Sequence, residues 1–575
     1  MSSIGSRIVK ALTSSSGVTS VSELHKKHLS EDWAKGRGIV EAYQLEVDMA
    51  GNAVILIFGI NGNFPKSLPC IFLTPWDTYG IIPHVEDDGY ICFAQEEGLL
   101  LISENVEGIV KESLARAITV LNDGISGKNQ IDFLDEFGAY WDRQLGIKTI
   151  NSFVAPSDTV KPIKIVKNDK KWNLLDDVSD FKKFFNVPTH RTIETVKAVH
   201  GIYIPLKKGT VLIPPHPKAF WTLPDIRQLV FDNIEASQRS MLETLLKKSK
   251  QDEVVLFSLP RLSVGETLFC IRFRGIPNGI HPLFDGRANE IVPMVVKRYD
   301  KEHMLPRGGS TNDFRSKRVL LLGCGSVGGF IATELTRAGI STMTVVDMDN
   351  LKYENIFRHV LGRNHINKPK VEGIKKDIES RLPFTTVTAV CKSLRDAQKS
   401  GDIKLSDFDL IISALGNPTE ELAFNEHIRQ VEAPPVLFTW LEPHGIGGHA
   451  LVTNLPSTVR GCLSCLYGQD EGETYCRAAF AAKNQFFAKN IDGCRSVFTP
   501  FGSLDAVRTT ELATRLAIEV LRGEVSQNQI RSWKGDSREF VKNGFKLSDR
   551  YQGATGHVIE DDTHFVRRDC NVCNR

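Results

Sequence analysis

The feature that most constrains the fold is a short apolar segment that opens into a glycine-rich turn. It runs from Arg318 to Gly329 and reads RVLLLGCGSVGG, with glycines at Gly323, Gly325 and Gly328. A buried strand followed by such a turn and a helix presents backbone N–H groups and a helix N-terminus to phosphate. Taken alone, these glycines are weak evidence, because such a turn can also simply allow close packing between a strand and a helix.

Polar residues beyond the next strand separate these two interpretations. They are Asp347, Asp349, Asn355, Arg358 and Lys370. An acidic residue at the end of the second strand can bind ribose hydroxyls, and an amide with two cations suits a triphosphate. Cations that stabilise charge on the α-phosphate of ATP are what an adenylylating enzyme needs, whereas a nicotinamide site has little use for them. The sequence therefore predicts an ATP site that serves adenylylation.

The same stretch resembles the ThiF/MoeB-type activating enzymes, the family to which ubiquitin-activating enzymes belong. The matching residues are the glycine-rich turn, the segment from Asp347 to Arg358 and the sequence Asn-Lys-Pro-Lys370. The resemblance implies a Rossmann-like α/β domain in which Asp347 binds the ribose. It also implies that Asn355, Arg358 and Lys370 bind the phosphates of ATP.

One part of the family pattern is missing. Where activating enzymes carry an aspartate that positions Mg²⁺, this chain reads Ser413-Ala-Leu-Gly-Asn417. Asp349 and Glu420 are the carboxylates that could take over this role. Mg²⁺ is expected with ATP, because it neutralises phosphate charge during transfer.

Two Cys-x-x-Cys motifs lie far apart in the C-terminal half, at Cys462 and Cys465 and at Cys570 and Cys573. Four thiolates can bind a structural zinc ion in a tetrahedral site that leaves no position open for substrate. Two disulfides are disfavoured in a reducing compartment, and unrelated buried cysteines are the other alternative. The sequence around Cys462 is also similar to the first zinc knuckle of the activating enzymes, so we expect zinc.

A further cysteine, Cys494, lies between these motifs and ahead of a helical pattern at Ala513–Leu521. A cysteine attacks an acyl group as the thiolate, which a neighbouring cation such as Arg495 and a following helix favour. In activating enzymes the catalytic cysteine lies in the segment after the first knuckle, and by that resemblance Cys494 is the nucleophile. A buried apolar cysteine is the structural alternative, and Cys476 is the competing candidate.

The N-terminal third predicts an antiparallel β-meander followed by a helix. Apolar runs at Ala53–Ile60 and Cys70–Leu73 are separated by turn residues, and an amphipathic pattern covers Val106–Leu121. Between them, His84 precedes Cys92 by eight residues across an acidic glycine turn. A histidine in this place can order a loop around a reactive cysteine, although either residue alone is equally compatible with a structural role.

This arrangement resembles the active-site stretch of ubiquitin-conjugating enzymes. That stretch reads His-Pro-Asn and later Gly-x-Ile-Cys, whereas here a Pro-His-Val sequence centred on His84 replaces the asparagine. The resemblance implies that Cys92 is the acyl acceptor and that His84 orders the site. The oxyanion-stabilising role is not carried over, and Asp87 and Asp88 are open candidates for it.

With 575 residues, the chain is long enough for about three or four domains. We expect a ubiquitin-conjugating-like α+β domain at residues 1–145, a linking or docking domain at 146–304 and the adenylation domain at 305–575. In the last domain, alternating β and α patterns predict a mainly parallel sheet with helices on both faces.

The middle part carries no motif with chemistry. Strand patterns surround a helical pattern near Ile226–Lys248. The expected strands are Pro162–Val166, Gly201–Pro205, Thr210–Ile213, Val254–Leu259 and Thr267–Arg274. A degenerate second adenylation-type fold is the alternative to a linking domain.

Charge and cysteine content exclude several classes of function. Lys and Arg number 71 against 69 Asp and Glu, so no bulk field favours nucleic acid or a membrane surface as a partner. No apolar stretch approaches the about 18 residues of a membrane span, and no secretory signal accompanies the 11 cysteines. We therefore expect a cytoplasmic protein.

Both halves together resemble the bacterial fused activating and conjugating proteins of CBASS antiphage systems. The resemblance implies adenylation of a protein carboxylate, a thioester on Cys494, transfer to Cys92 and attack by a lysine amine of a target. Fusion would make the transfer between the two cysteines intramolecular. The activated tail would belong to a cGAS/DncV-like nucleotidyltransferase or a ubiquitin-like protein, and the enzyme would be a homodimer.

Two other functions stay open. A sulfur-carrier adenylyltransferase of cofactor biosynthesis would use the ATP site and leave Cys92 without a role. A scaffold that binds ATP without turning it over is suggested by the missing aspartate near Gly416. ATP–pyrophosphate exchange with a candidate substrate tail separates both enzymes from the scaffold.

Overall fold

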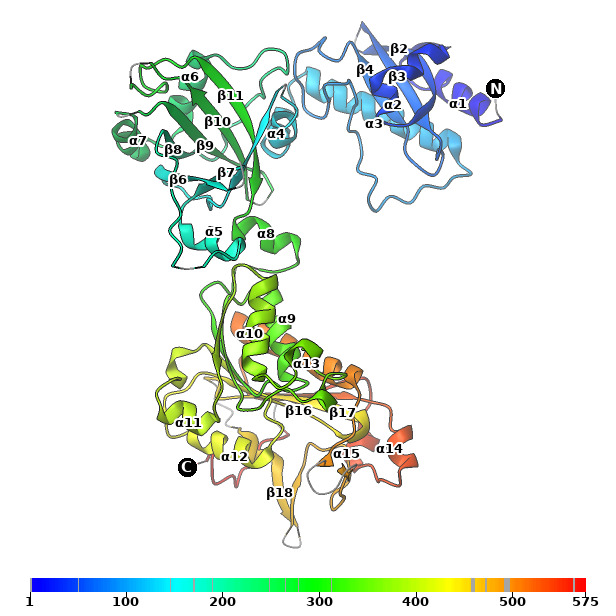
Figure 1. Ribbon diagram of the computed structural model, residues 1–575. Coiled ribbons are helices and arrows are strands. Elements are labelled where there is room, and N and C mark those ends of the chain that lie inside the picture. Colours follow the sequence, from blue (N-terminus) through cyan, green and yellow to red (C-terminus); the bar gives the residue numbers. More distant parts are fainter. Residues whose placement is uncertain are drawn as a thin grey trace. The chain divides into compact units, whose positions relative to one another are not determined.

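The structure is a computed structural model whose contacts form two compact units (Figure 1). The first unit comprises Met1–Val178 and Thr192–Asp300, and the second comprises Ser179–Arg191 and Lys301–Arg575. The described residues are 3–49, 51–144, 146–168, 171–188, 190–247, 249–263, 265–277, 279–311, 313–456, 461–470, 473–490, 497–561 and 564–574.

The first unit begins with a helix and an antiparallel four-stranded sheet, which confirms the predicted meander. The sheet follows α1 (Ser3–Thr13) and has the order β1-β2-β3-β4. Its strands are β1 (Val18–Glu23), β2 (Ile39–Met49), β3 (Asn52–Asn61) and β4 (Cys70–Thr74). The long helix α3 (Val106–Ile125) covers one face, and its Val110 and Leu114 share a core with Leu45 and Phe58.

Two short helices cover the other face of this sheet. They are η1 (Lys26–Ser30) and α2 (Asp32–Lys35). Trp33 of α2 lies edge-on to Phe72, with ring centroids 5.0 Å apart. After the Cys92 loop and α3 come η2 (Gln130–Asp132) and α4 (Phe133–Trp141). The sequence assigns α4 to the first domain, yet its apolar side chains Phe137 and Trp141 lie in the core of the next one.

That next domain is a closed barrel with the strand order β10-β11-β5-β7-β6-β8-β9. Its strands are β5 (Lys148–Ser152), β6 (Lys161–Asn168), β7 (Lys171–Leu175), β8 (Val199–Pro205), β9 (Asp252–Pro260), β10 (Glu266–Arg274) and β11 (Glu290–Arg298). The expected strand at Thr210–Ile213 is wrong, because these residues form no strand. The barrel differs from the open sheet of an adenylation domain, which disfavours a degenerate second copy.

The single helix expected in the barrel domain is interrupted. It divides into α6 (Leu223–Asn233), η3 (Ala236–Gln238) and α7 (Arg239–Leu246). α6 begins at a capping box between Thr222 and Asp225 and ends where Ile234 adopts an extended backbone. Ile226, Val230 and Leu242 keep the apolar face continuous across the break, which explains why the sequence pattern reads as one helix.

The second unit contains an eight-stranded sheet with the order β14-β13-β12-β15-β16-β17-β22-β23. Its strands are β12 (Arg318–Leu322), β13 (Thr342–Val346), β14 (Thr386–Val390), β15 (Leu410–Ser413), β16 (Val436–Leu441), β17 (Gly447–Thr453), β22 (Gln529–Lys534) and β23 (Val558–Asp561). The strands from β14 to β16 are parallel, and β17, β22 and β23 add antiparallel pairs. The mainly parallel sheet is confirmed.

Helices cover both faces of this sheet, as predicted. On one face lie α9 (Gly328–Arg337), α10 (Lys370–Arg381) and α13 (Ser503–Arg522), and on the other lie α11 (Leu394–Lys399) and α12 (Pro418–His427). Val319 and Leu321 of β12 point into the first core, and Leu320 and Leu322 point into the second. A strand buried on both sides is apolar at successive positions, which is the pattern of the RVLLL segment.

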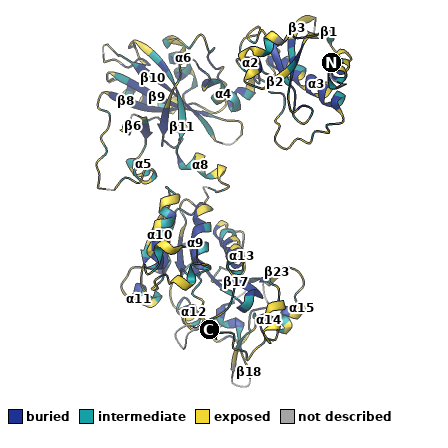
Figure 2. Ribbon diagram, turned by 45° about the vertical axis from the view of Figure 1, so that its right-hand side comes forward, coloured by how far each residue is buried: buried dark blue, intermediate teal, exposed yellow. Residues whose placement is uncertain are grey.

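Smaller elements complete the second unit. They are α5 (Val178–Phe184), α8 (Lys301–Arg307), η8 (Leu463–Leu466), β18 (Tyr467–Asp470), β19 (Glu473–Cys476), β20 (Lys489–Asn490), β21 (Val497–Phe498), α14 (Arg538–Lys542) and α15 (Asp549–Gly553). Figure 2 shows buried residues concentrated in the strands and on the inner sides of the helices. Within the described residues, every helix is too short or too polar to cross a membrane.

Candidate functional site

The glycine-rich turn joins β12 to α9 and combines two roles. Gly323 has φ 88°, and a Cβ there would lie 2.5 Å from the carbonyl oxygen of Ala414, just after β15. A Cβ at Gly328 would lie 2.0 Å from the carbonyl oxygen of Gly323. These two glycines therefore permit close packing. A Cβ at Gly325 would meet no described atom within 4 Å, which leaves open space at the N-terminus of α9 for an anion.

Asp347 follows β13 and is hydrogen-bonded to the backbone of this turn. Its Oδ2 accepts a hydrogen bond from Cys324 N (2.7 Å), and its Oδ1 accepts one from Asp349 N (2.8 Å). Lys370, the first residue of α10, places its Nζ 2.8 Å from Asp349 Oδ2 and 3.7 Å from Asp347 Oδ2. Each carboxylate oxygen of Asp347 can accept a further hydrogen bond, so it can still bind a ribose hydroxyl.

Arg358 is a second cation near this turn. It is half-buried, and its guanidinium lies 4.6 Å from the centre of the Phe501 ring. Burial lowers the pKa of Arg358, and no ion pair with a carboxylate is found for it among the described residues. A half-buried guanidinium without a carboxylate partner suits a phosphate group. Asn355 ends the short helix η4 (Tyr353–Asn355) just before it and is partly exposed.

Two further residues support the turn and were not expected from the sequence. His359 is buried, and its Nε2 lies 2.7 Å from the carbonyl oxygen of Cys324, while its Nδ1 accepts a hydrogen bond from Leu361 N. Thr510 of α13 donates a hydrogen bond to the carbonyl oxygen of Val327 (3.3 Å). Neither position has a sequence signal, because a buried histidine or threonine is common in any core.

The carboxylates that could bind Mg²⁺ lie around this turn and at the start of α12. Asp349 is 62% exposed, and Glu420 is exposed on the first turn of α12. Glu421 is buried and its Oε1 accepts the Ser413 hydroxyl (2.7 Å), and burial raises the pKa of Glu421 to about 7. Mg²⁺ is usually held by one or two carboxylates together with phosphate oxygens. Asp349 and Glu420 fit that requirement, whereas Glu421 does not.

The four cysteines of the two Cys-x-x-Cys motifs come together in one buried cluster. Their sulfur atoms all lie within 4.8 Å of one another. The Sγ atoms of Cys462 and Cys465 are 4.0 Å apart, those of Cys462 and Cys570 3.7 Å, and those of Cys465 and Cys573 3.5 Å. A tetrahedral ZnS₄ centre with bonds of about 2.3 Å requires sulfur separations of about 3.8 Å. The donor set therefore fits zinc.

Arg477 joins the two halves of this cluster. It donates hydrogen bonds to the carbonyl oxygens of Cys465 (3.1 Å), Phe565 (3.2 Å) and His564 (3.2 Å). Its guanidinium is therefore engaged with the backbone near both cysteine pairs. The neighbouring Cys476 ends β19, and burial raises its pKa to about 12. Cys476 therefore carries little thiolate near neutral pH, which weakens it as the competing nucleophile.

Cys494 and Arg495 lie outside the described residues. The flanking segments pair as a short ladder, in which Lys489 of β20 is opposite Phe498 of β21. The assignment of Cys494 as the first acyl acceptor therefore stays a prediction.

The loop that carries Cys92 folds back along β4. Phe72 and Tyr90 are opposite each other, and Ile91 N donates a hydrogen bond to Ile71 O (2.8 Å). Cys92 N donates one to His84 O (2.7 Å), which joins the two expected site residues through the backbone.

The Cys92 thiol is half-buried in an acidic neighbourhood. Burial raises its pKa, and the carboxylates of Glu136 and Glu86 raise it further, against the opposing effect of Arg37 and Arg143. Within the loop itself, Asp88 accepts hydrogen bonds from Arg37 and Tyr90 N, while Asp87 is exposed. As an ionised carboxylate neither offers a donor to an oxyanion, so the residue that stabilises the oxyanion stays unassigned.

His84 is held by two carboxylates from another part of the chain. Its backbone has φ 67°, in the left-handed region. Its Nδ1 lies 2.5 Å from Glu136 Oε1 and its Nε2 lies 3.0 Å from Asp132 Oδ2, and its backbone N donates to Glu136 Oε2 (2.9 Å). The hydrogen bond to Glu136 raises the pKa of His84 most, and the hydrogen bond to Asp132 raises it further. Burial lowers this pKa, and the net result is a value of about 9. His84 is therefore an imidazolium near neutral pH.

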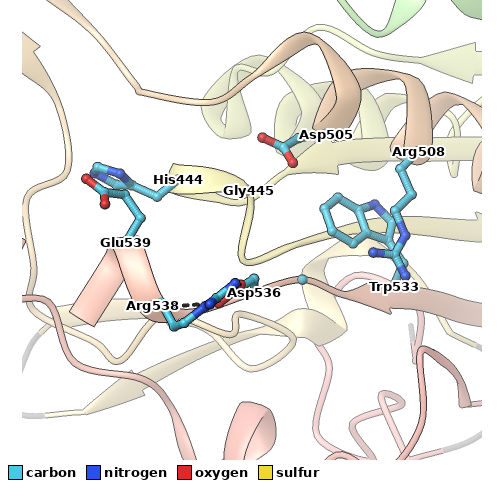
Figure 3. Close-up of a pocket in the computed structure, with 9 residues that line it drawn as sticks. His444, Gly445, Asp505, Arg508, Trp533, Asp536, Arg538 and Glu539 are labelled. Carbon is cyan, nitrogen blue, oxygen red and sulfur yellow. Dashed lines mark hydrogen bonds and ion pairs between the residues drawn. The ribbon is translucent and has the colours of Figure 1, made fainter. Parts of the chain in front are cut away.

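A polar cavity of about 540 Å³ lies beside β17 and β22 (Figure 3). Its lining residues are His444, Gly445, Asp505, Arg508, Trp533, Gly535, Asp536, Arg538 and Glu539. Arg508 stacks on the Trp533 ring at 4.5 Å, and Arg538 pairs with Asp536 at 2.5 Å. β17 begins opposite the end of β16, which is parallel to β15. The cavity therefore lies at the same edge of the sheet as the glycine-rich turn.

Comparison with known families accounts for both halves of the chain. The model of Prokaryotic E2 family B matches residues 23–149, and the model of the ThiF family matches residues 299–543. An ATP-dependent ubiquitin transferase-like protein Cap2 from Pseudomonas aeruginosa is 24% identical over 77% of this chain and 80% of its own length. The chain is therefore similar to a fused Cap2 protein over most of its length. A Cap2 protein from Escherichia coli is 20% identical, with 77% of this chain and 81% of that protein covered.

This similarity agrees with the fold and with the positions of the motifs. His84, Cys92 and all of α4 lie in the range matched by the E2 family, and the glycine-rich turn lies in the ThiF range. The expected fold class, an E2-like α+β domain followed by a linking domain and a ThiF-type domain, is confirmed. The adenylyltransferase and sulfurtransferase UBA4 of Yarrowia lipolytica is also similar, at 25% identity over 25% of this chain and 37% of that protein. The chain is an enzyme of the adenylating, ubiquitin-like conjugation class.

Proposed function

We propose that this Cap2-like protein activates a protein carboxyl terminus with ATP and passes it to an amine through two cysteine thioesters. The observation that carries the proposal is the presence of two complementary sites in one chain. A ThiF-type nucleotide site lies in the second unit, and a half-buried cysteine lies in the loop of an E2-type domain in the first. Adenylation makes a carboxylate reactive, and a second cysteine has a role only if the acyl group moves on.

In the first step, the carboxylate of the substrate tail attacks the α-phosphate of ATP. A bond forms between a carboxylate oxygen and the phosphorus, the bond to the β-phosphate breaks, and pyrophosphate leaves. The N-terminus of α9, Arg358 and Lys370 offer the positive charge that holds the phosphates and stabilises this transfer. Lys370 must then exchange part of its interaction with Asp349 for phosphate oxygens, and Mg²⁺ at Asp349 or Glu420 would favour that exchange.

The polar cavity in Figure 3 receives the end of the substrate tail in this proposal. It lies at the same sheet edge as the glycine-rich turn, and Phe501, which stacks on Arg358, precedes the helix that carries Asp505 and Arg508. An extended peptide offers backbone amides and a terminal carboxylate, which arginine and carboxylate side chains can bind. We therefore propose that the tail reaches the nucleotide along this edge.

In the second step, Cys494 attacks the adenylated carboxyl group to give a thioester and AMP. The Cys92 thiol then exchanges with this thioester, and a lysine amine of the target attacks the acyl group on Cys92 to form an isopeptide bond. Each transfer breaks the bond to the previous carrier as the new bond forms, and one proton leaves the incoming nucleophile. The raised pKa of Cys92 makes it a poor leaving group, which suits it to hold the acyl group as a thioester.

By the resemblance to fused CBASS proteins, we propose a role in antiphage defence, with the tail of a cGAS/DncV-like nucleotidyltransferase as the substrate. We also propose a homodimer formed through the adenylation domain. Leu504 and Val507 on the first turns of α13 are 84% and 42% exposed, so this helix offers apolar surface to a second copy.

The proposal is tested by ATP–pyrophosphate exchange with the purified protein and a peptide that ends with the tail of a cGAS-like synthase. We expect exchange that depends on the peptide and persists in Cys92→Ala and Cys494→Ala, since adenylation precedes both thioesters. An amidated tail of the same sequence is the matched control. If no exchange occurs with this tail or with any other protein carboxyl terminus, the proposed enzymatic activity is wrong. The ATP-binding scaffold is then the remaining alternative.

A sulfur-carrier adenylyltransferase is the second candidate, supported by the similarity to UBA4. It would act on a small carrier that ends in Gly-Gly and would not need the first unit. Conversion of such a carrier at the same rate by wild type and Cys92→Ala, without any adduct on Cys92, would favour it. The match of residues 23–149 to an E2 family favours conjugation instead.

A further inference from the structure

Helix α4 has two faces with different partners. Its apolar face consists of Leu134, Phe137 and Trp141, which lie in the core cluster of the barrel. On another side, Glu136 and Tyr140 continue a stripe of polar residues that begins at Asp132, just before α4, and ends at Arg143, two residues beyond it. Residues three and four apart share one side of a helix, so this stripe is continuous.

The apolar face anchors α4 in the barrel. The rings of Phe137 and Trp141 each lie 4.9 Å from that of Phe269 on β10, and Trp141 Nε1 donates to Met294 O of β11 (3.0 Å). A Cβ on Gly138 would lie 3.1 Å from Thr267 Cγ2 on β10, which leaves little room between helix and strand. Burial of two large aromatic side chains stabilises such a contact by several kcal/mol, about 1.5–3 for each side chain.

The polar face binds the loop that carries His84 and Cys92. The Tyr140 hydroxyl accepts a hydrogen bond from Val85 N (3.1 Å) and has the carbonyl oxygens of Ile82 (3.0 Å) and Val85 (2.9 Å) as acceptors. Arg143 forms an ion pair with Glu86 (2.8 Å). The stripe therefore contacts four residues of the segment from Ile82 to Glu86, which leads to Cys92, and one of these four is His84, which Glu136 and Asp132 bind.

These contacts determine the backbone and the charge of His84. A non-glycine residue with φ 67° carries strain of about 1–2 kcal/mol, which persists only where surrounding contacts impose it. Glu136 imposes it from both sides, because one oxygen accepts the backbone N–H of His84 and the other accepts its ring. His84 O in turn accepts the N–H of Cys92, so the position of Cys92 depends on this contact.

We propose that the barrel, by anchoring α4, positions the loop of the conjugating site. Glu136, Asp132 and Tyr140 are positioning residues that hold His84 as an imidazolium and fix the Cys92 loop. The backbone oxygen of His84 accepts the N–H of Cys92, so its charged ring is fixed in the loop that carries the acceptor cysteine. This inference deepens the proposed function and rests on it for the transfer step. The positioning itself is a property of the protein without substrate, so the two can fail separately.

The test compares Glu136→Gln with Asp135→Asn in the full chain. Asp135 is the matched control, because it lies on the same helix and binds Arg261 and Ser263 of the barrel instead of the loop. Selective ¹³C labelling of histidine, with the His84 signal assigned by His84→Gln, gives the imidazole pKa by NMR. We expect a value near 9 in wild type and Asp135→Asn and a fall toward the unperturbed value of about 6.5 in Glu136→Gln.

A second readout is the rate at which iodoacetamide alkylates Cys92, resolved by mass spectrometry. Removal of the Glu136 carboxylate lowers the pKa of Cys92 and frees its loop, so we expect alkylation several-fold faster in Glu136→Gln and unchanged in Asp135→Asn. Tyr140→Phe, which leaves all charges in place, should increase the rate less and leave the His84 pKa near that of wild type. An unchanged His84 pKa together with an unchanged alkylation rate in Glu136→Gln would overturn the positioning role.

The link to transfer is measured by single-turnover release of the acyl group from Cys92 to an amine. We expect a lower maximal rate in Glu136→Gln with an unchanged half-saturating amine concentration, because the variant alters the site and not the binding of the amine. An unchanged maximal rate would overturn the role in transfer. If wild type forms no thioester at all, the proposed function fails, while the NMR and alkylation readouts still decide whether α4 positions the loop.

Discussion

The nucleotide site and the Cys92 site are assembled in different ways. The nucleotide site is built from the ends of neighbouring parallel strands and the first residues of two helices, all between Arg318 and Lys370. The Cys92 site takes its loop from residues 82–92 and its supporting side chains from α4, which is itself fixed by the barrel. The first is a local motif, and the second depends on how two domains pack. A local motif can be identified from the sequence, but supporting contacts across domains cannot.

The largest expected effect tests the local character of the nucleotide site. Arg358→Ala and Lys370→Ala should each lower ATP–pyrophosphate exchange by roughly a hundredfold or more, because each removes a cation that faces developing phosphate charge. Arg363→Ala is the matched control, since Arg363 is exposed nearby and should leave exchange unchanged. Exchange at the wild-type rate in both variants would show that the triphosphate binds elsewhere. The nucleotide site would then not be a local motif, and its difference from the Cys92 site would no longer hold.

A second prediction concerns the four-cysteine cluster, which is also assembled across the sequence but within one unit. Cys570→Ser should lose zinc and lower the unfolding temperature of the second unit, because a structural zinc site contributes on the order of several kcal/mol to folding. Metal analysis and thermal unfolding measure the two effects.

The exposed Cys391 provides the control for this experiment. Cys391→Ser should retain about one zinc ion per chain and the wild-type unfolding temperature. Full zinc content in Cys570→Ser would contradict the four-thiolate site and leave the cysteines as a buried cluster without metal.

A smaller effect is the pH dependence of the Cys92 loop. The pKa of His84 is raised to about 9 by Glu136 and Asp132, so its contribution to stability is complete below about pH 6.5 and is lost as the pH rises through 9. The side chain is 25% exposed, so we expect on the order of 1–2 kcal/mol of local stability. Hydrogen exchange of residues 82–92 at pH 7 and 9.5, corrected for intrinsic rates, measures this change.

The pH effect should be specific to that loop. Peptides from β12 serve as the control and should keep their protection over the same pH range. In His84→Gln the loop should be less protected at pH 7 and should show little further loss at pH 9.5. A loop whose protection is equal at both pH values in wild type would show that the ion pairs of His84 do not hold it.

The sequence predicts the parts of the fold that have a repeating pattern. The apolar run before Gly323 and the alternation of strands and helices predict a parallel sheet, and the two cysteine pairs predict the cluster that the structure brings together. Cys92 and His84 also mark a loop in the sequence, and its role in conjugation stays a prediction. ATP and zinc binding stay predictions.

Contacts that arise only from packing could not be predicted from the sequence. Glu136 and Tyr140 lie in an aromatic helix whose pattern does not say which domain it joins. The barrel strands β5 and β7 are short enough to escape detection, and β11 contains Pro293, a residue that sequence patterns count against a strand. His359 and Thr510 bind the backbone of the glycine-rich turn from elements that the motif does not include. A buried polar residue acquires its role from its neighbours, and these are known only once the elements are placed.

The central claim is that one acyl group passes between the two sites. The most direct measurement is intact-mass detection with non-reducing gels after incubation with ATP and a cGAS-like synthase, in wild type, Cys92→Ala, Cys494→Ala and the control Cys70→Ala. The account predicts a thiol-sensitive adduct in wild type and Cys70→Ala, an adduct trapped on Cys494 in Cys92→Ala, and none in Cys494→Ala. An adduct that forms on Cys92 without Cys494, or that never reaches Cys92 in wild type, would contradict the relay.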